Sequence, residues 1–518
     1  MAEKQTTYDA IPYPSNPFRQ TRPERLAAVA KLFGLDAPPA DRCSVLEIGC
    51  SMGGNLVVMA QDHPRSRYIG IDASGRQIAE GWKTVEALGL QNLQLKHMDV
   101  LEVGEDLGKF DYIICHGVFS WVPARVQNKI LEICQRQLSA NGIAYISYNT
   151  YPGWHIRGIV RDMMFYRGTQ FPDPAAALAQ AKSLVQFVAQ ATKGADTPYQ
   201  RLLQSELKHL TQMEDYYLHH EHLEENNQPL YFHEFARKVA VNGLQYLGDA
   251  EFSTMVSTNF SPEVAKTLHE LGAHDILQME QYMDFVRCRY FRKSLLCRSS
   301  VKLNRTLTPA VVRDLLLSSD AAPVPAKPGA PAEVETFKTS SGYSVNCRSP
   351  ITKAALRELH AQWPMPVAFK DLIAHSKADE AGAEFLAGEM LTCMAAGVVE
   401  WRLTPVLFTT EIGKMPATTA LARLEAQRGY KITNLRGESI VLDELHRQTV
   451  RQLDGKRDLA QVADALLASL QKGDLMLQRD SDKSTVTESA EMRKLLGPAL
   501  EKVLANLAKK ALLARADA

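Results

Sequence analysis

The chain has 518 residues, enough for about three domains, and 45% of them are hydrophobic, which allows large cores. Its 59 Lys and Arg balance its 59 Asp and Glu, which argues against binding nucleic acid through bulk charge. The 8 cysteines form no C-x-x-C pair, the N-terminal stretch lacks a signal-peptide pattern, and no run of about 18 apolar residues occurs. We therefore expect a cytoplasmic protein with reduced thiols and no membrane span.

The first 40 residues are punctuated by proline and carry aromatic side chains at Tyr8, Tyr13 and Phe18. A helical pattern follows over residues 23–33 and stops at Gly34. An aromatic arm ahead of the first strand either packs on the fold or covers a bound ligand, and the residues alone leave both readings open.

The stretch VLEIGCSMGGN at residues 45–55 predicts a short buried strand, a glycine turn and the start of a helix. This arrangement forms the ligand-binding corner of a doubly wound α/β domain, where glycine allows close approach of the backbone. Glu47 precedes the first glycine, so the loop carries a negative charge that disfavours pyrophosphate and suits a cationic ligand. Asp72, 23 positions after Gly49, ends the next strand, where an acid holds ribose hydroxyls. The alternative is a glycine turn without a ligand.

Further strands are expected at residues 93–97, 110–115 and 143–148, with helices over 74–88 and 125–138. The strand at 110–115 leads into HGVFSWVP, and the strand at 143–148 leads into NTYPGWH. The carboxyl ends of parallel strands share one edge of a sheet, so we expect these two aromatic loops to converge there. Helices then dominate residues 156–240, and the stretches 244–255 and 283–290 are candidates for the closing antiparallel hairpin.

The second half of the chain begins with a Pro/Ala-rich stretch at 321–331, typical of an extended spacer. Three helical patterns and a short strand follow, which suggest a winged helix. We expect no nucleic-acid binding there because Lys and Arg are not concentrated; a homodimer contact is possible instead. The predicted domains are a core at 1–169 and 236–315, a helical cap or regulatory insertion at 170–235, a linker at 316–336, a winged-helix-like domain at 337–405 and a second α-rich domain at 406–518.

The motifs VLEIGCSMGGN, YIGIDAS, HMDV, FDYIICHGVFSWVP and GIAYISYNTYPGWH resemble class I S-adenosylmethionine-dependent methyltransferases. Within that class the sequence resembles bacterial lysine methyltransferases of outer-membrane proteins, which carry a methyltransferase regulatory domain. The resemblance implies a Rossmann-like seven-stranded sheet with a helical cap and a mainly helical, winged-helix-like C-terminal region. It implies S-adenosylmethionine as cofactor, with Tyr8 near the ligand, and a cofactor site built from Tyr13, Glu47, Gly49, Cys50, Gly53, Gly54, Asn55, Asp72, Gln77, Asp99, Val100, His116 and Gly117.

Aromatic walls suit a lysine acceptor because they pack on its stem and attract its ammonium group. The expected acceptor channel consists of Trp121, Tyr151 and Trp154, with His116 beside it and Tyr231 and His233 as contributions from the cap. Packing of these aromatics in a core is the alternative for each residue. A helical cluster at 219–222 contains three histidines, yet it reads as a charged helix, and we expect no metal site.

Lysine in a protein is the expected methyl acceptor, by direct in-line displacement. A small molecule or RNA is the alternative acceptor. A regulatory protein that binds S-adenosylmethionine without transferring its methyl group is the alternative of a different class.

Overall fold

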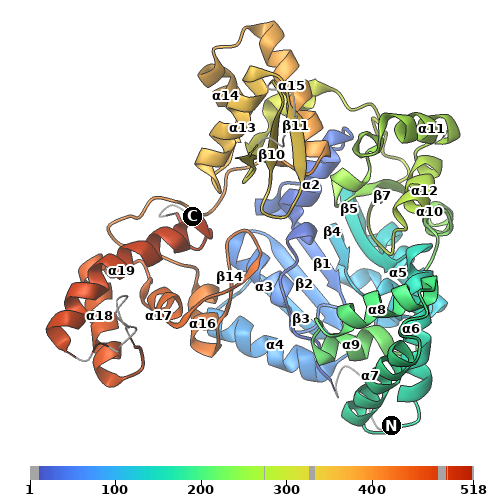
Figure 1. Cartoon of the computed structure of the whole chain (residues 1–518), viewed down its shortest axis with the longest axis horizontal. Helices are drawn as coiled ribbons and strands as arrows, with labels where there is room; N and C mark the ends of the chain where they lie inside the picture. The colour runs from blue at the N-terminus through green and yellow to red at the C-terminus, as the bar shows by residue number, and fades with distance from the viewer. Residues whose placement is uncertain (1–10, 273–274, 326–332, 477–485, 487, 516–518) are drawn as a thin grey trace.

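The computed structural model describes residues 11–272, 275–325, 333–476, 486 and 488–515. Its centre is a seven-stranded sheet in the order β3-β2-β1-β4-β5-β7-β6 (Figure 1). The pairs among β1 to β5 are parallel, whereas β7 runs antiparallel to β5 and β6. The Rossmann-like class I sheet is therefore confirmed. The strands are β1 (Ser44–Ile48), β2 (Arg67–Asp72), β3 (Leu93–His97), β4 (Phe110–Cys115), β5 (Leu138–Asn149), β6 (Leu244–Asp249) and β7 (Phe291–Arg298).

Successive side chains of each central strand enter different cores because a strand alternates its side chains between the two faces. Val45 of β1 joins one apolar core and its neighbour Leu46 joins the other. Both faces of the sheet must therefore be covered, which explains the nearly continuous apolar runs in these strands. The helices of this part are α2 (Pro23–Leu32), α3 (Gly54–Asp62), α4 (Gly75–Leu88), α5 (Ala124–Gln137), α10 (Phe232–Val241), α11 (Pro262–Gly272) and α12 (Ile276–Arg287).

The closing hairpin of the sheet was predicted only in part. The first candidate contains β6, but the second, at 283–290, is wrong: Met283 lies in α12 and the strand is β7. Arg292 in β7 is fully buried and pairs with Glu280 at 2.8 Å and with Asp284 at 2.7 Å, both from α12. A charged residue at a core position interrupts the apolar pattern that identifies a buried strand. It is tolerated there because its acidic partners come from another element, which the local sequence does not reveal.

Four helices form the cap, which has its own apolar core around Val160, Val185 and Leu218 (Figure 1). They are α6 (Gly153–Gly168), α7 (Pro174–Ala191), α8 (Pro198–Leu210) and α9 (Asp215–His222). The cap begins earlier than the predicted boundary at 170, because Val160 and Met164 of α6 belong to its core. Since α6 follows β5 directly, the cap is attached at the edge where the aromatic loops lie.

The predicted linker at 316–336 is wrong over its described residues. β8 (Leu316–Ser318) pairs with β12 (Val367–Ala368) and β13 (Glu400–Arg402), and Leu317 is fully buried. The prolines led to the prediction of a spacer. However, β9 (Ala322–Val324) pairs with the strand at 335–338 as an edge strand, where proline is tolerated. Residues 326–332 lie outside the described part. The other elements here are β10 (Glu335–Lys338), β11 (Ser344–Cys347), α13 (Pro350–Gln362), α14 (Phe369–Ser376) and α15 (Glu380–Ala395).

The last part of the chain has a separate apolar core that includes Val450, Leu466 and Leu504. It docks on the first part through the backbone N–H of Leu421, which donates to Gln61 of α3 at 2.8 Å. Within the described residues, no helix combines the length and apolar character needed to cross a lipid bilayer. The elements are α16 (Ala420–Arg428), β14 (Lys431–Thr433), β15 (Ser439–Val441), α17 (Glu444–Gln452), α18 (Leu459–Lys472) and α19 (Ser489–Lys509).

Candidate active site

The glycine loop after β1 is held against the end of β2. Gly49 and Cys50 both donate their backbone N–H to the carbonyl of Ile71, at 2.9 and 3.0 Å. Asp72, the last residue of β2, accepts from the backbone N–H of Ser51 at 2.8 Å and of Ser74 at 2.9 Å. Gly49 has a φ of +75°, and an added Cβ would lie 2.4 Å from Val118. The loop can therefore pass between β1 and the loop after β4 only with glycine there.

Glu47 places a carboxyl group under this loop. It is 3% exposed, and its Oε1 accepts from Asn55 Nδ2 at 2.8 Å. Its Oε2 is buried without a hydrogen-bond partner in the part of the chain that the structure describes. Burial raises the pKa of Glu47 to about 8; the Asn55 bond opposes that rise and the charge of Asp72 adds to it. A cation bound above the loop would stabilise the ionised form and reverse this shift.

The N-terminal arm crosses the same loop. Ser15 Oγ accepts from the N–H of Gly54 at 2.6 Å, at the first residue of α3. Asn55 Oδ1 accepts from the N–H of Phe18 at 2.9 Å, and Ser51 Oγ donates to the carbonyl of Tyr13 at 3.2 Å. The arm is therefore tied to the glycine loop along its length. Sequence reasoning missed this role of Ser15, because a serine between two prolines carries no specific signal.

Tyr13 lies between the arm and the cap. Its ring is 5.5 Å from that of Tyr216 and 5.8 Å from that of His220. Burial raises the pKa of Tyr13 to about 12, and the charges on Tyr216 and Glu221 add to this, so its hydroxyl stays protonated. Tyr8 lies outside the described residues.

The loop after β4 brings His116 to the carboxyl edge. Its ring lies tilted against that of Phe18 of the arm at 4.1 Å, and its Nδ1 lies 3.0 Å from Tyr145 Oη and 3.1 Å from Ser147 Oγ. Burial lowers the pKa of His116 to about 3, and the nearby charge of Lys293 contributes. His116 is consequently a neutral hydrogen-bonding group at pH 7. Gly117, with a φ of +69°, borders open space in which an added Cβ would meet no atom within 4 Å.

The two aromatic loops do converge, and they form one wall. Trp121 and Trp154 meet edge to face at 6.2 Å, and Tyr151 lies 5.2 Å from Tyr231. Trp154 is only 3% exposed, so it supports the wall from behind. Trp121, Tyr151 and Tyr231 are partly exposed. Gln228 joins the cap to this edge by donating its N–H to the carbonyl of Ser120 at 2.7 Å.

The remaining candidates surround the loop at different depths. Gln77 is buried near Ser51, with which its side chain forms a short hydrogen bond. Cys50 is buried over Gly70, and burial raises the pKa of its thiol well above the usual range. Asp99 is exposed after β3 and accepts from the N–H of Leu101 at 2.9 Å, beside partly exposed Val100. His233 is exposed; its Nδ1 bonds Gln281 at 2.9 Å and its ring stacks on Tyr231 at 5.6 Å.

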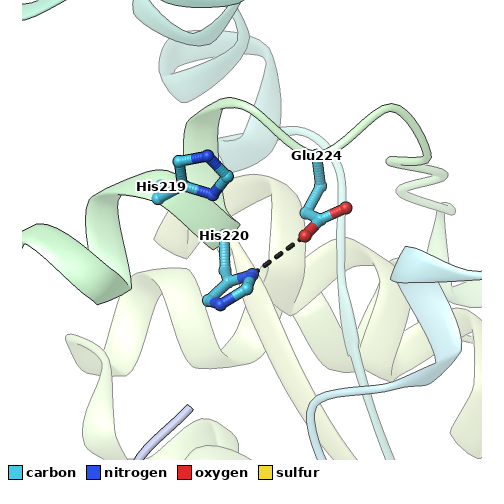
Figure 2. Close-up of side chains that lie close together, drawn as sticks. All are labelled: His219, His220 and Glu224. Atoms are coloured by element: carbon cyan, nitrogen blue, oxygen red, sulfur yellow. Dashed lines mark hydrogen bonds and ion pairs between the residues drawn. The ribbon is translucent and has the colours of Figure 1, made fainter. Parts of the chain in front are cut away.

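The histidine cluster of α9 acts as a contact between cap and arm (Figure 2). Ligand atoms of His219, His220 and Glu224 lie within 4.8 Å of one another. Both ring nitrogens of His220 are already engaged, Nδ1 with Glu224 at 2.9 Å and Nε2 with the carbonyl of Ile11 at 2.8 Å. These hydrogen bonds tie His220 to Glu224 and to the arm, whereas Nδ1 of the buried His219 has no partner in the described part of the chain.

Three protein-family models match the chain. A methyltransferase domain matches residues 45–142, and a predicted methyltransferase regulatory domain matches residues 214–298. The C-terminal winged helix domain of PKMT matches residues 414–512. That winged helix therefore lies in the part predicted only as α-rich, and the regulatory model covers α9 to β7 rather than the insertion at 170–235.

One relative and one solved structure match over nearly the whole chain, and a further relative matches over less than half of it. Protein RP789 of Rickettsia prowazekii is 35% identical, over 96% of this chain and 93% of that protein. Protein RP028 of the same organism is 42% identical, over 45% of this chain and 93% of that protein. The structure of PKMT2 from Rickettsia typhi in complex with AdoHcy matches with a TM-score of 0.86 and 30% identity, over 97% of this chain and 100% of that one.

Proposed function

Because this chain belongs to the family of class I S-adenosylmethionine-dependent methyltransferases that includes PKMT2 of Rickettsia typhi and RP789 of Rickettsia prowazekii, we propose that it methylates lysine side chains of proteins. PKMT stands for protein lysine methyltransferase, and the match to PKMT2 includes the winged helix. The observation that supports the proposal in this chain is the aromatic wall of Trp121, Trp154 and Tyr151 at the carboxyl edge of the sheet. We further propose that the protein acts in the cytoplasm.

S-adenosylmethionine is the cofactor, and the residues of the loop fit it. The orphaned Oε2 of Glu47 supplies a buried negative charge for a ligand with a sulfonium and an ammonium group. The open space beside Gly117 leaves room at the carboxyl end of β4. When bound, the cofactor would supply an activated methyl group: a nucleophile would attack the methyl carbon in line with the sulfur, the carbon–sulfur bond would break, and AdoHcy would leave. Asp72, at the end of β2, is the residue expected to hold the ribose.

Positioning is the main task of this chain in such a reaction, because transfer needs a close and dehydrated nucleophile. The arm and the cap cover the glycine loop, which excludes water from the cofactor edge. His116, neutral at pH 7, adds no positive charge beside the transferring group. Tyr145 and Ser147 fix its ring through Nδ1. We assign no general base.

The aromatic wall suits a lysine side chain on two grounds. Trp121 and Tyr151 offer partly exposed ring faces to the apolar stem and to the ammonium or methylammonium group. Partial burial of the amine beside these rings also favours its neutral form, which is the nucleophile.

The test is transfer of labelled methyl by the purified chain to a lysate from cells that lack it, followed by mass spectrometry of proteins. We expect methyl-lysine with the unchanged protein, and no product with Asp72→Ala. Trp121→Ala should retain cofactor affinity within about threefold while losing about tenfold or more of transfer, since it removes part of the proposed acceptor wall and its contact with Trp154 but no residue of the glycine loop. The matched control is Tyr343→Ala, which removes a half-exposed ring in the C-terminal part of the chain.

Two results would contradict the proposal. Methylation confined to RNA or to small molecules would replace the acceptor while leaving the enzyme class intact. Tight cofactor binding without transfer to any protein, RNA or small amine would instead support a sensor of S-adenosylmethionine.

A further inference from the structure

A cavity outside the active site lies where three parts of the chain meet. Its volume of about 50 Å³ is several times the roughly 10–15 Å³ that a water molecule needs. Its walls come from η1 (Arg19–Thr21) and α2 of the core, from β13, and from the turn at 435–436 before β15. A second cavity of about 380 Å³ adjoins it and shares Arg19, Glu400 and Arg436. Figure 1 shows α2 between the central sheet and the helices α13 and α15.

The charges around the smaller cavity do not balance. Five arginines and two glutamates line it. They are Arg19, Arg22, Arg25, Arg402, Arg436, Glu24 and Glu400.

Three of the arginines have acidic partners. Arg19 and Arg436 share Glu400, at 2.8 and 3.1 Å, and both also approach Glu438. Arg22 pairs with Glu24 at 2.5 Å and with Asp62 at 2.7 Å. These pairs hold the core, β13 and the winged helix domain together.

Arg25 and Arg402 remain. Neither guanidinium has an ion pair within 4 Å in the described part of the chain, although both line the cavity. Burial lowers the pKa of each to about 10, and neighbouring arginines, Arg19 foremost for Arg25, add to the shift. Arg402 Nε is buried without a partner among these residues, and so is Nη1 of Arg22, a residue only 4% exposed. A cavity wall with this excess of donors and positive charge is complementary to an anion.

We propose that this cavity binds a small oxyanion of the phosphate class, held by Arg25, Arg402 and the free Nη1 of Arg22. Guanidinium groups present planar pairs of N–H donors that match the oxygens of phosphate. Acidic macromolecules fit the site less well, because Trp401 and Phe408 help to enclose it. The ligand is therefore a free phosphate or the phosphate group of a small metabolite.

The site is connected to the active site through very few residues. η1 follows directly after Phe18, whose ring lies against that of His116 at 4.1 Å. An anion that fixes Arg22 and Arg25 also fixes the base of the arm that covers the glycine loop. Binding of the anion should therefore strengthen the docking of the arm.

The test uses the full chain in a phosphate-free chloride buffer, with thermal unfolding followed during titration with inorganic phosphate. Sodium chloride at matched ionic strength and sodium acetate serve as ion controls. We expect a saturable rise in the unfolding temperature with phosphate only. Arg25→Gln and Arg402→Gln should each weaken phosphate binding by about tenfold or more, since each removes a charge-assisted contact. The protein control is Arg237→Gln, which changes an exposed arginine of α10.

Titrations with phosphomonoesters distinguish a free phosphate ligand from a phosphorylated metabolite. Tighter binding of glycerol phosphate or of a nucleoside monophosphate than of inorganic phosphate, with the same loss in both variants, identifies a metabolite that extends into the larger cavity. Without phosphate, both variants should unfold no earlier than the unchanged protein, because each removes an unpaired partly buried charge. An equal phosphate effect in the unchanged protein and the double variant would overturn the proposal, as would its absence from the unchanged protein. DNA that binds with the same dependence on Arg25 and Arg402 would also overturn it.

Discussion

The carboxyl group of Glu47 should make both folding and cofactor binding depend on pH, and Glu47→Gln should remove both effects. The side chain is 3% exposed, and its Oε2 has no partner in the described chain. Its pKa is raised from 4.5 to about 8, chiefly by burial. Glutamine keeps the shape and can still contact Asn55 while carrying no charge, which makes it the sharpest perturbation of this group.

The raised pKa of Glu47 determines whether the free energy of unfolding rises or falls with pH. A carboxyl group with a raised folded pKa is protonated in the folded state while the unfolded chain is already ionised. Its contribution to the free energy of unfolding is therefore complete below pH 4.5 and is lost as the pH rises toward 8. The loss is about 1.4 kcal/mol per pH unit within this window, and at most about 4–5 kcal/mol in total. Urea unfolding of the cofactor-free protein at pH 5 and pH 8.5 measures it, and Glu47→Gln should be less sensitive to pH.

Binding of the cofactor should make ionisation of Glu47 favourable. A bound cation favours the ionised carboxylate, so binding at pH 7 should release a proton, and affinity should rise with pH up to about 8. The slope attributable to Glu47 approaches tenfold per pH unit at most. Calorimetry of S-adenosylmethionine binding in two buffers of different ionisation enthalpy measures the proton. The difference between the unchanged protein and Glu47→Gln isolates this group from the cofactor's own titration. An identical pH slope in both proteins would refute the reasoning.

Three further substitutions test other parts of the argument. Gly54→Ala places a Cβ 2.7 Å from Ser15 Oγ; the arm must shift, and we expect weaker cofactor binding by calorimetry with little change in unfolding temperature. Arg292→Met leaves two buried carboxylates without their partner and should cost about 3–5 kcal/mol in urea unfolding; a milder loss at neutral than at low pH would contradict this. His220→Phe removes the hydrogen bond from the cap to the Ile11 carbonyl of the arm, together with the bond to Glu224, so amide exchange at residues 12–18 should accelerate, whereas unchanged exchange would show that other contacts hold the arm.

The sequence predicted the strands β1 to β4 well because β1, β2 and β4 are largely apolar runs and β3 alternates apolar and polar side chains. The same logic failed at β7, where Arg292 and Lys293 interrupt the apolar pattern. Arg292 is compatible with a buried strand only because Glu280 and Asp284 reach it from α12. Such a pairing depends on tertiary structure, which local periodicity does not contain. The strand β8 was missed for a related reason, since its partners β12 and β13 lie about 50 and 80 residues further along the chain.

The residues of the candidate site also fall into those that the sequence could place and those that depend on tertiary structure. Glu47 and Asp72 were predictable because the ends of parallel strands fix where such residues lie. The position of Phe18 against His116 was not, because hydrogen bonds from Ser15 and Phe18 to the glycine loop set the path of the arm. Trp154 was predicted in a loop but lies in the first turn of α6, and its burial against Trp121 depends on how that helix packs.

The winged helix domain contacts the parts of the core that carry the cofactor loop. Lys431 Nζ donates to Asn16 Oδ1 of the arm at 2.6 Å, and Arg428 donates to Thr84 of α4 at 2.9 Å. Gln61, which accepts from Leu421, belongs to α3, the helix that starts at the glycine loop. If the cofactor binds at the glycine loop as proposed, the arm that crosses this loop must move for the cofactor to exchange. Because the domain holds the arm and both helices beside the loop, it opposes that movement and should set how readily the site opens. A domain in this position can govern turnover without touching either substrate.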